Sequence, residues 1–270
     1  MTKGRKVLVY AFLIIVSLVS VFPLYFMICA ATNDSVSVMR GTLKFGTMGL
    51  TNLKNLFDSI PVGRGMWNSL RNALVQTVLS VFLNALAGYG FEVYHDKKKD
   101  AVFVLILMTM MIPFVAVMVP MFTIFSGMGL LNTIWSLLLP STASAMLVML
   151  FRQASRSFPV EIMDAARVDG VSEIGIFFRM FVPTMKSTFG AAFTVGFMGA
   201  WNNFLWPLLI FQRQDKKTMP VLVSTLQTVN GKIDYGMVMM GTLVLTLPTM
   251  IIFLLLQKSF AAGITGASKG

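Results

Sequence analysis

The chain has 270 residues, of which 56% are hydrophobic and only 12% are charged, and the charged share is well below that of soluble domains. This composition excludes an ordinary soluble domain and, without the short alternating segments of a strand barrel, predicts an all-α polytopic membrane protein. The net charge is +11, but Lys and Arg lie in short runs at the ends of apolar segments, which favours membrane anchoring over nucleic-acid binding.

Six apolar runs predict a bundle of six membrane spans. They lie near residues 7–31, 68–91, 101–125, 134–151, 186–211 and 236–258. The first run is too long for the apolar region of a signal peptide, so we expect it to be retained. Prolines within or at the ends of the runs predict bent helices packed around a pathway. Residues 1–270 are therefore expected to form a single transmembrane domain.

The orientation follows from the charges of the connecting segments. Six spans place both termini on one side of the membrane. Three lysines occupy residues 97–99, whereas no Lys or Arg occurs in 126–133, so we expect cytoplasmic N- and C-termini in the cell membrane. Residues 152–185 then form a cytoplasmic loop and residues 212–235 an extracytoplasmic one. The second loop could be a plain connector or could contact a partner that delivers substrate.

The acidic residues argue against self-sufficient transport. All eleven Asp and Glu residues fall outside the centres of the predicted spans, whereas ion-coupled carriers usually hold ionisable groups at membrane depth. The sequence has no phosphate-binding P-loop, and its single cysteine and single histidine offer no metal site. We therefore predict no catalytic residue, metal or cofactor in this chain, and expect a partner to supply the driving energy.

A semi-polar stretch between the fourth and fifth predicted spans has the signals of a helical hairpin. Pro159 suits a first helical turn, and Glu161 and Asp164 place negative charge where a helix N-terminus favours it. Gly170 is predicted to end this helix in the left-handed conformation, and Ser172 to cap a second helix that runs parallel to the membrane. On these residues alone, the hairpin could insert into a partner's cleft or lie on lipid headgroups.

The sequence Asp164-Ala165-Ala166, followed by Gly170 and by Phe181-Val182-Pro183, resembles the "EAA" loop of ATP-binding-cassette (ABC) importer permeases. Asp164 stands where that pattern has Glu. The resemblance implies that this loop is a coupling helix docking on a separate ATPase. It assigns the contact to six residues, Glu161, Asp164, Ala165, Ala166, Asp169 and Gly170.

Further motifs resemble the carbohydrate-uptake branch of the same family, and specifically the second, shorter membrane subunit of maltose-type importers. They are Asn68-Ser69, Gly127–Thr133, the segment Trp201-Asn202-Asn203-Phe204-Leu205-Trp206-Pro207 and the glycine-rich tail Gly263–Gly270. The likeness covers nearly the whole chain. It implies a sugar substrate and a complex with a homologous second permease, an ATPase dimer that binds ATP and Mg, and an extracytoplasmic solute-binding protein.

The resemblance also implies roles for residues outside the loop. Ala267 and Lys269 of the tail would contact the ATPase, and residues 212–235 would reach into the binding protein. Trp201, Asn202, Asn203 and Trp206 are candidates for sugar contact or gating, although tryptophans at span ends are often interfacial anchors. The alternatives are a self-sufficient channel or secondary carrier and, third, a membrane-embedded enzyme.

Overall fold

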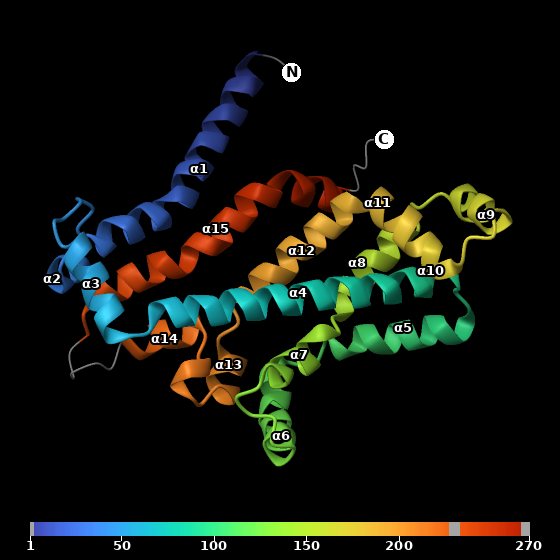
Figure 1. Ribbon diagram of the computed structural model, residues 1–270. Coiled ribbons are helices and arrows are strands. Elements are labelled where there is room, and N and C mark those ends of the chain that lie inside the picture. The colour runs from blue at the N-terminus through green and yellow to red at the C-terminus, as the bar shows by residue number, and fades with distance from the viewer. Residues whose placement is uncertain (1–2, 227–232, 266–270) are drawn as a thin grey trace. The chain divides into compact units, whose positions relative to one another are not determined.

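The computed structural model describes residues 3–226 and 233–265 (Figure 1). This described part consists of helices and connecting turns, and it contains no strand, which confirms the predicted all-α class. The chain divides into two compact units, one of Met1–Met66 with Met219–Leu247 and one of Trp67–Thr218 with Pro248–Gly270.

The first unit gathers the N-terminal helices around a small apolar core. It contains α1 (Lys3–Ala31), α2 (Ser35–Met39), α3 (Gly49–Ser59), the start of α4 (Val62–Val93), α14 (Met219–Thr225) and the start of α15 (Tyr235–Thr265). Leu56, Leu222 and Leu226 are fully buried in this core. The buried Asn52 amide donates to the carbonyls of Ala31 and Asn33 at 2.9 Å each, which ties the end of α1 to α3.

The second unit is built along the rest of α4. Its helices are α5 (Lys97–Thr109), α6 (Phe114–Gly127), α7 (Ile134–Thr142), α8 (Ala145–Ser155), α9 (Val160–Val168), α10 (Glu173–Ile176), the π-helical η1 (Phe177–Phe181), α11 (Val182–Thr184), α12 (Lys186–Trp201), α13 (Leu205–Ile210), the 3-10 turn η2 (Gln214–Lys216) and the end of α15. An aromatic core joins α4, α8, α9, α10, η1 and α12, and a second apolar cluster joins α6, α7 and α13. The ring of Tyr89 lies 5.4 Å from that of Phe177 and 4.9 Å from that of Phe181, so η1 packs directly on α4.

Three of the predicted spans occur as single long helices. Gly4–Ala31, Val62–Val93 and Tyr235–Lys258 are each long and apolar enough to cross a membrane. Two further candidates are bent helix pairs, at 96° between α5 and α6 and at 46° between α7 and α8, so the described residues hold three to five candidate spans. The segments predicted at 7–31, 68–91 and 236–258 are thus helical, while the total of six stays a prediction.

Continuous helices through the segments 101–125 and 186–211 are wrong, and the segment 134–151 is likewise divided, into α7 and α8. The first segment is interrupted because Pro113 disfavours the helical conformation of the residue before it, and α6 begins directly after this proline. The second is interrupted between Trp201 and Leu205, because Pro207 has no N–H to donate to the carbonyl of Asn203. The prolines predicted bending, and the structure shows that two of them interrupt the helices altogether.

Gly88 marks a close approach of α4 to α8. A Cβ added there would lie 2.7 Å from Val148 O, from Phe151 Cβ and from Arg152 N, and two of these atoms are backbone. We expect Gly88→Ala to lower the free energy of unfolding by about 1–3 kcal/mol, because a backbone clash cannot be relieved by a rotamer change. Thermal unfolding in detergent would measure the loss. Gly90→Ala is the control, since nothing lies within 4 Å of the added Cβ; equal melting of the two variants would contradict the expectation.

Candidate functional site

The helix α9 begins and ends as the sequence predicts. Pro159 is its N-cap residue, directly before the first helical residue, and Asp169 is its C-cap residue. Gly170 has a φ of +75°, the left-handed conformation expected of it. Its N–H donates to Arg167 O at 3.0 Å, and the next N–H, of Val171, donates to Ala166 O at 2.9 Å. These two bonds form a Schellman motif, which ends α9 sharply and reverses the chain.

The second arm of the hairpin starts at Ser172, whose hydroxyl accepts the N–H of Gly175 at 3.2 Å. This confirms the predicted cap. Pro183 lies inside the short α11, and α12 starts at Lys186 after a break at Met185. In Figure 1 α10 lies next to the C-terminal end of α4, and α9 extends beyond it.

The hairpin has one buried and one exposed face. Met163 and Ala166 pack into the aromatic core, and Ala166 is 5% exposed. The other five residues assigned to the ATPase contact are exposed: Glu161, Asp164, Ala165, Asp169 and Gly170. Packing within this chain therefore does not account for Ala165.

Val168 is a surface feature that the motif comparison missed. Its side chain is 88% exposed on α9, although it is β-branched and apolar. At about 100° per residue, a position five residues after the buried Met163 lies on the far side of the helix. Together with Ala165 it gives the exposed side of α9 an apolar patch, and this spacing could have revealed the patch from the sequence.

An ion network braces the hairpin. Arg167 contacts Glu173 of α10 with its Nε 2.8 Å from Oε1, and Asp164 of its own helix with Nη1 3.0 Å from Oδ1. Tyr94, just after α4, donates its hydroxyl to the Glu173 carboxylate. The acid of the Asp-Ala-Ala motif thus belongs to a chain of contacts that runs from α9 through α10 to the end of α4.

The network makes the hairpin sensitive to acid. Hydrogen bonds from Arg167 and then from Tyr94 lower the pKa of Glu173 below its ordinary 4.5, while burial and the bond to Glu173 raise the pKa of Tyr94 to about 12. A carboxyl with a lowered folded-state pKa stabilises the structure above its unfolded pKa, and this contribution is lost as the pH falls through the lowered value. The relevant window therefore lies below 4.5.

We expect the hydrogen-exchange protection factor of the Val171 amide to fall as the pH drops through that window. The reason is that protonated Glu173 releases Arg167 and loosens the turn. Exchange measured by mass spectrometry on peptides covering the turn would test this. The Arg167→Gln variant should already have a low protection factor at neutral pH. Equal protection of the wild-type Val171 amide at neutral pH and below pH 4.5 would contradict the expectation.

The tryptophan motif divides into buried rings and accessible amides. Trp201 ends α12 at 1% exposed and stacks on Phe197 with ring centroids 5.8 Å apart. Trp206 is also 1% exposed, and its indole N–H donates to Ser136 O at 2.8 Å. Asn202 is exposed and Asn203 half-buried between them. Of the four candidates for sugar contact or gating, only the two asparagines are accessible within this chain.

The other predicted contact segments are partly described. Ala267 and Lys269 lie outside the described residues. The segment 212–235 is not simply a polar loop, because it contains α14, in which Met219 and Leu222 are fully buried. Its apolar run 219–223 signals a buried segment, but so short a run does not by itself distinguish a helix from a strand.

A row of polar side chains along α4 was also missed. It comprises Asn68, Asn72, Gln76, Ser80 and Asn84, spaced four residues apart, so that each lies next to the following one in a stripe that winds around the helix. The ends of the row are bonded: Asn68 donates to Asp215 O at 3.0 Å, and Asn84 donates to Thr142 O at 2.8 Å and accepts the Ser144 N–H at 2.9 Å. Asn84 thereby holds the break between α7 and α8 against α4.

Comparison with known proteins gives a consistent result. Residues 80–266 match the family "Binding-protein-dependent transport system inner membrane component". The lactose transport system permease protein LacG of Rhizobium radiobacter is 43% identical, over 96% of this chain and 95% of its own. The arabinooligosaccharides transport system permease protein AraQ of Bacillus subtilis is 35% identical over 96% and 94%, and the sn-glycerol-3-phosphate transport system permease protein UgpE of Pectobacterium atrosepticum is 30% identical over 99% and 98%.

Solved structures share the fold. A chain in the crystal structure of a bacterial ABC transporter involved in the import of the acidic polysaccharide alginate matches with a TM-score of 0.80 at 17% identity, over 96% of this chain and 99% of its own. A second alginate transporter structure, in complex with a pentasaccharide-bound periplasmic protein, matches with a TM-score of 0.66 at 15% identity, over 99% and 97%. The chain belongs to the family of inner membrane components of binding-protein-dependent transport systems, and it is a multi-pass membrane transport subunit rather than an enzyme.

Proposed function

We propose that this chain is the permease subunit of an ATP-driven sugar or oligosaccharide importer and forms half of its translocation pathway with a second permease. Two of its relatives are permease proteins of lactose and arabinooligosaccharide transport systems. The observation that carries the proposal is the braced hairpin of α9 and α10, which leaves Ala165 and Val168 exposed at its surface.

The hairpin is the proposed coupling element. It would insert into a cleft of an ATPase dimer that binds ATP and Mg and closes when it does so. The contacts of Arg167, Glu173 and Tyr94 would carry that closure from α9 to the end of α4. Because α4 also bears the polar row, movement of α4 would change access to the pathway. Ala267 and Lys269 are proposed as a second ATPase contact.

The remaining assignments complete the proposed complex. The chain would cross the cell membrane six times, with both termini and residues 152–185 in the cytoplasm. Residues 212–235 would face an extracytoplasmic solute-binding protein. The carboxamides of Asn202 and Asn203 would contact sugar hydroxyls or gate the pathway, since amides both donate and accept hydrogen bonds.

Uptake into proteoliposomes tests the function. The chain co-expressed with its ATPase, second permease and binding protein should accumulate radiolabelled lactose only when ATP is supplied. The chain reconstituted by itself should move none. Sugar uptake by the isolated chain without ATP would overturn the proposal and favour a self-sufficient carrier.

A further inference from the structure

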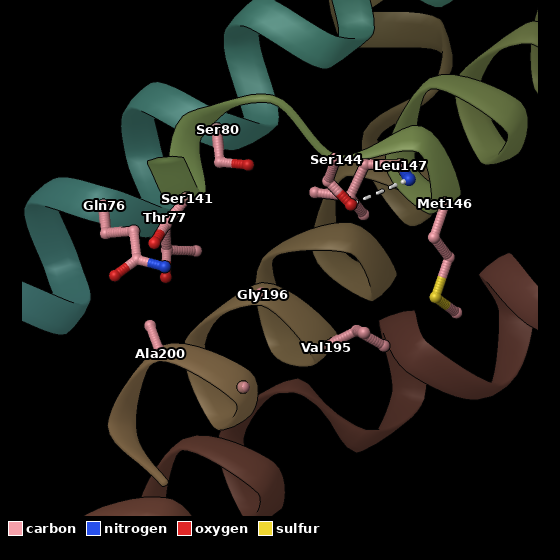
Figure 2. A pocket seen from close by; sticks show the side chains of 11 residues that line it. Gln76, Thr77, Ser80, Ser141, Ser144, Met146, Leu147, Val195, Gly196 and Ala200 are labelled. Carbon is pink, nitrogen blue, oxygen red and sulfur yellow. Dashed lines mark hydrogen bonds between the residues drawn. The ribbon is translucent and has the colours of Figure 1, made fainter. Parts of the chain in front are cut away.

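The second unit contains a partly open cavity of about 200 Å³ bounded by α4, α7, α8 and α12. Figure 2 shows the polar groups of Gln76, Thr77, Ser80 and Ser141 gathered on one side of it. Met146, Leu147 and Val195 line the other side, together with Ser144, whose hydroxyl accepts the Leu147 N–H. The polar wall consists of Gln76 and Ser80 of the row on α4, the adjacent Thr77, and Ser141 in the last turn of α7.

Two atoms of this wall lack partners. Thr77 is 1% exposed, yet its hydroxyl makes no hydrogen bond, and the buried Oε1 of the neighbouring Gln76 makes none either. Thr194, a buried threonine on α12, instead donates to the carbonyl four residues earlier, Gly190 O, at 2.8 Å. Leaving a buried polar group without a hydrogen bond is unfavourable, so two such atoms on residues that line one cavity indicate a ligand that supplies the missing bonds.

The surrounding groups hold this wall in place. Asn84 donates to Ser80 Oγ at 2.9 Å and bonds the break between α7 and α8, which fixes Ser80 relative to Ser141. Opposite, α12 contributes glycines. A Cβ added at Gly196 would lie 3.2 Å from Thr77 Cγ2, whereas one added at Gly199 would meet nothing within 4 Å. Gly196 therefore lets α12 lie close against Thr77, and Gly199, which lines the cavity, leaves space open there.

The lining selects the chemistry of the ligand. No charged side chain is among the described residues that line the cavity. A carboxylate or phosphate would have to give up its hydration there without a cation to replace it. A sugar ring suits the cavity better, because its hydroxyls can bond to the amide and hydroxyl wall while its C–H face packs on Met146, Leu147 and Val195.

We propose that this cavity is a binding subsite, within this chain itself, for one ring of a neutral sugar. The proposal rests on the proposed import function and adds a substrate class to it. The relatives belong to transport systems for lactose, arabinooligosaccharides and sn-glycerol-3-phosphate. The uncharged cavity favours a neutral substrate such as the first two over a phosphorylated one such as the third. Thr77 and Gln76 would bond the sugar directly.

The first test compares two threonine variants in the assembled complex in proteoliposomes. Thr77→Val keeps the side-chain shape and removes the hydroxyl that faces the cavity. Thr194→Val removes a buried hydroxyl that is already bonded within its own helix. We expect Thr77→Val to lower ATP-dependent lactose uptake about tenfold, the equivalent of one hydrogen bond, with Thr194→Val near the wild-type rate. Equal uptake by Thr77→Val and wild type would overturn the subsite.

A second variant covers the case in which Thr77→Val fails to assemble. Gly199→Leu blocks the cavity by volume, and the structure leaves room for its Cβ. It should assemble, as judged by size-exclusion chromatography, and lose uptake. Full uptake with the cavity blocked would overturn the subsite as well.

Thiol labelling tests binding directly. Cys29 is the only cysteine of the chain, so Ser141→Cys in a Cys29→Ala background places a single reactive thiol in the cavity. Lactose should slow its labelling in the assembled complex, and glucuronate should not. If lactose did not slow the labelling of this thiol either, the cavity would hold water only and the subsite would be overturned. If the wild-type complex imported no sugar at all, the proposed function itself would fail. If it imported sugar, but the cavity variants kept full uptake and lactose did not slow labelling, only the subsite would fail.

Discussion

Ala165→Asp is expected to lower ATP-dependent sugar uptake about 100-fold, because it would bury an unpaired carboxylate in the contact with the ATPase. Ala165 is exposed on α9 and has no packing role in its own chain, so the chain should fold and insert normally. Uptake into vesicles, normalised to the amount of complex, measures the effect. Val168→Asp should act in the same way, because Val168 is 88% exposed on the same helix.

Three further variants separate coupling from folding. Ser157→Asp adds the same charge at an exposed position before α9, and it should leave uptake unchanged. Ala166→Asp should instead reduce the amount of folded protein, since Ala166 lies in the aromatic core. Gly170→Pro should uncouple hydrolysis from uptake, because it removes both the left-handed turn and the N–H bonded to Arg167 O. Full uptake by Ala165→Asp at matched expression would contradict the assigned contact.

Arg152→Met is expected to lower the free energy of unfolding by about 3 kcal/mol. Arg152 is 9% exposed, and its Nε lies 3.0 Å from Glu92 Oε2 and its Nη2 2.5 Å from Asp100 Oδ1. Its guanidinium also sits 4.2 Å over the ring of Phe103. The residue therefore joins α4, α5 and α8, and methionine would leave Glu92 mostly buried with one partner fewer.

Arg156→Met is the matched control for this variant. The Arg156 side chain is 63% exposed and makes a single contact with Glu92, Nε to Oε1 at 3.2 Å. Exposed pairs of this kind contribute about 0–1 kcal/mol. In thermal unfolding in detergent, wild type and Arg156→Met should have similar melting temperatures, and Arg152→Met a clearly lower one. Adding Glu92→Gln to Arg152→Met should recover part of the loss, and three equal melting temperatures would contradict the stabilising role of Arg152.

The sequence predicted those features that depend on local chemistry. Low charge and long apolar runs indicated a helical membrane protein, and the turn at Gly170 followed from the need for a residue that tolerates positive φ. The cap at Ser172 likewise depends on a side chain and a backbone N–H three residues apart. Such contacts are decided within one turn of helix, so residue types alone were sufficient.

Features that depend on distant partners were not predicted. Hydropathy alone could not distinguish a proline that bends a helix from one that interrupts it, so the breaks before Pro113 and Pro207 were read as continuous spans. The tryptophans were candidates for substrate contact because their type allows it, but the bond from Trp206 to Ser136 joins segments 70 residues apart. The polar row of α4 was visible as a spacing of four, yet the unbonded state of Thr77 required the packed structure.

The central claim is that an ATPase acts on this chain through the hairpin of α9 and α10, and photocrosslinking tests it most directly. A benzophenone amino acid placed at Ala165 in the assembled complex should capture the ATPase subunit in the cytoplasm. The same group at the exposed Val115 of α6 should not. If the Ala165 position captured only lipid, or reacted with an impermeant reagent added outside intact cells, the coupling mechanism would be contradicted.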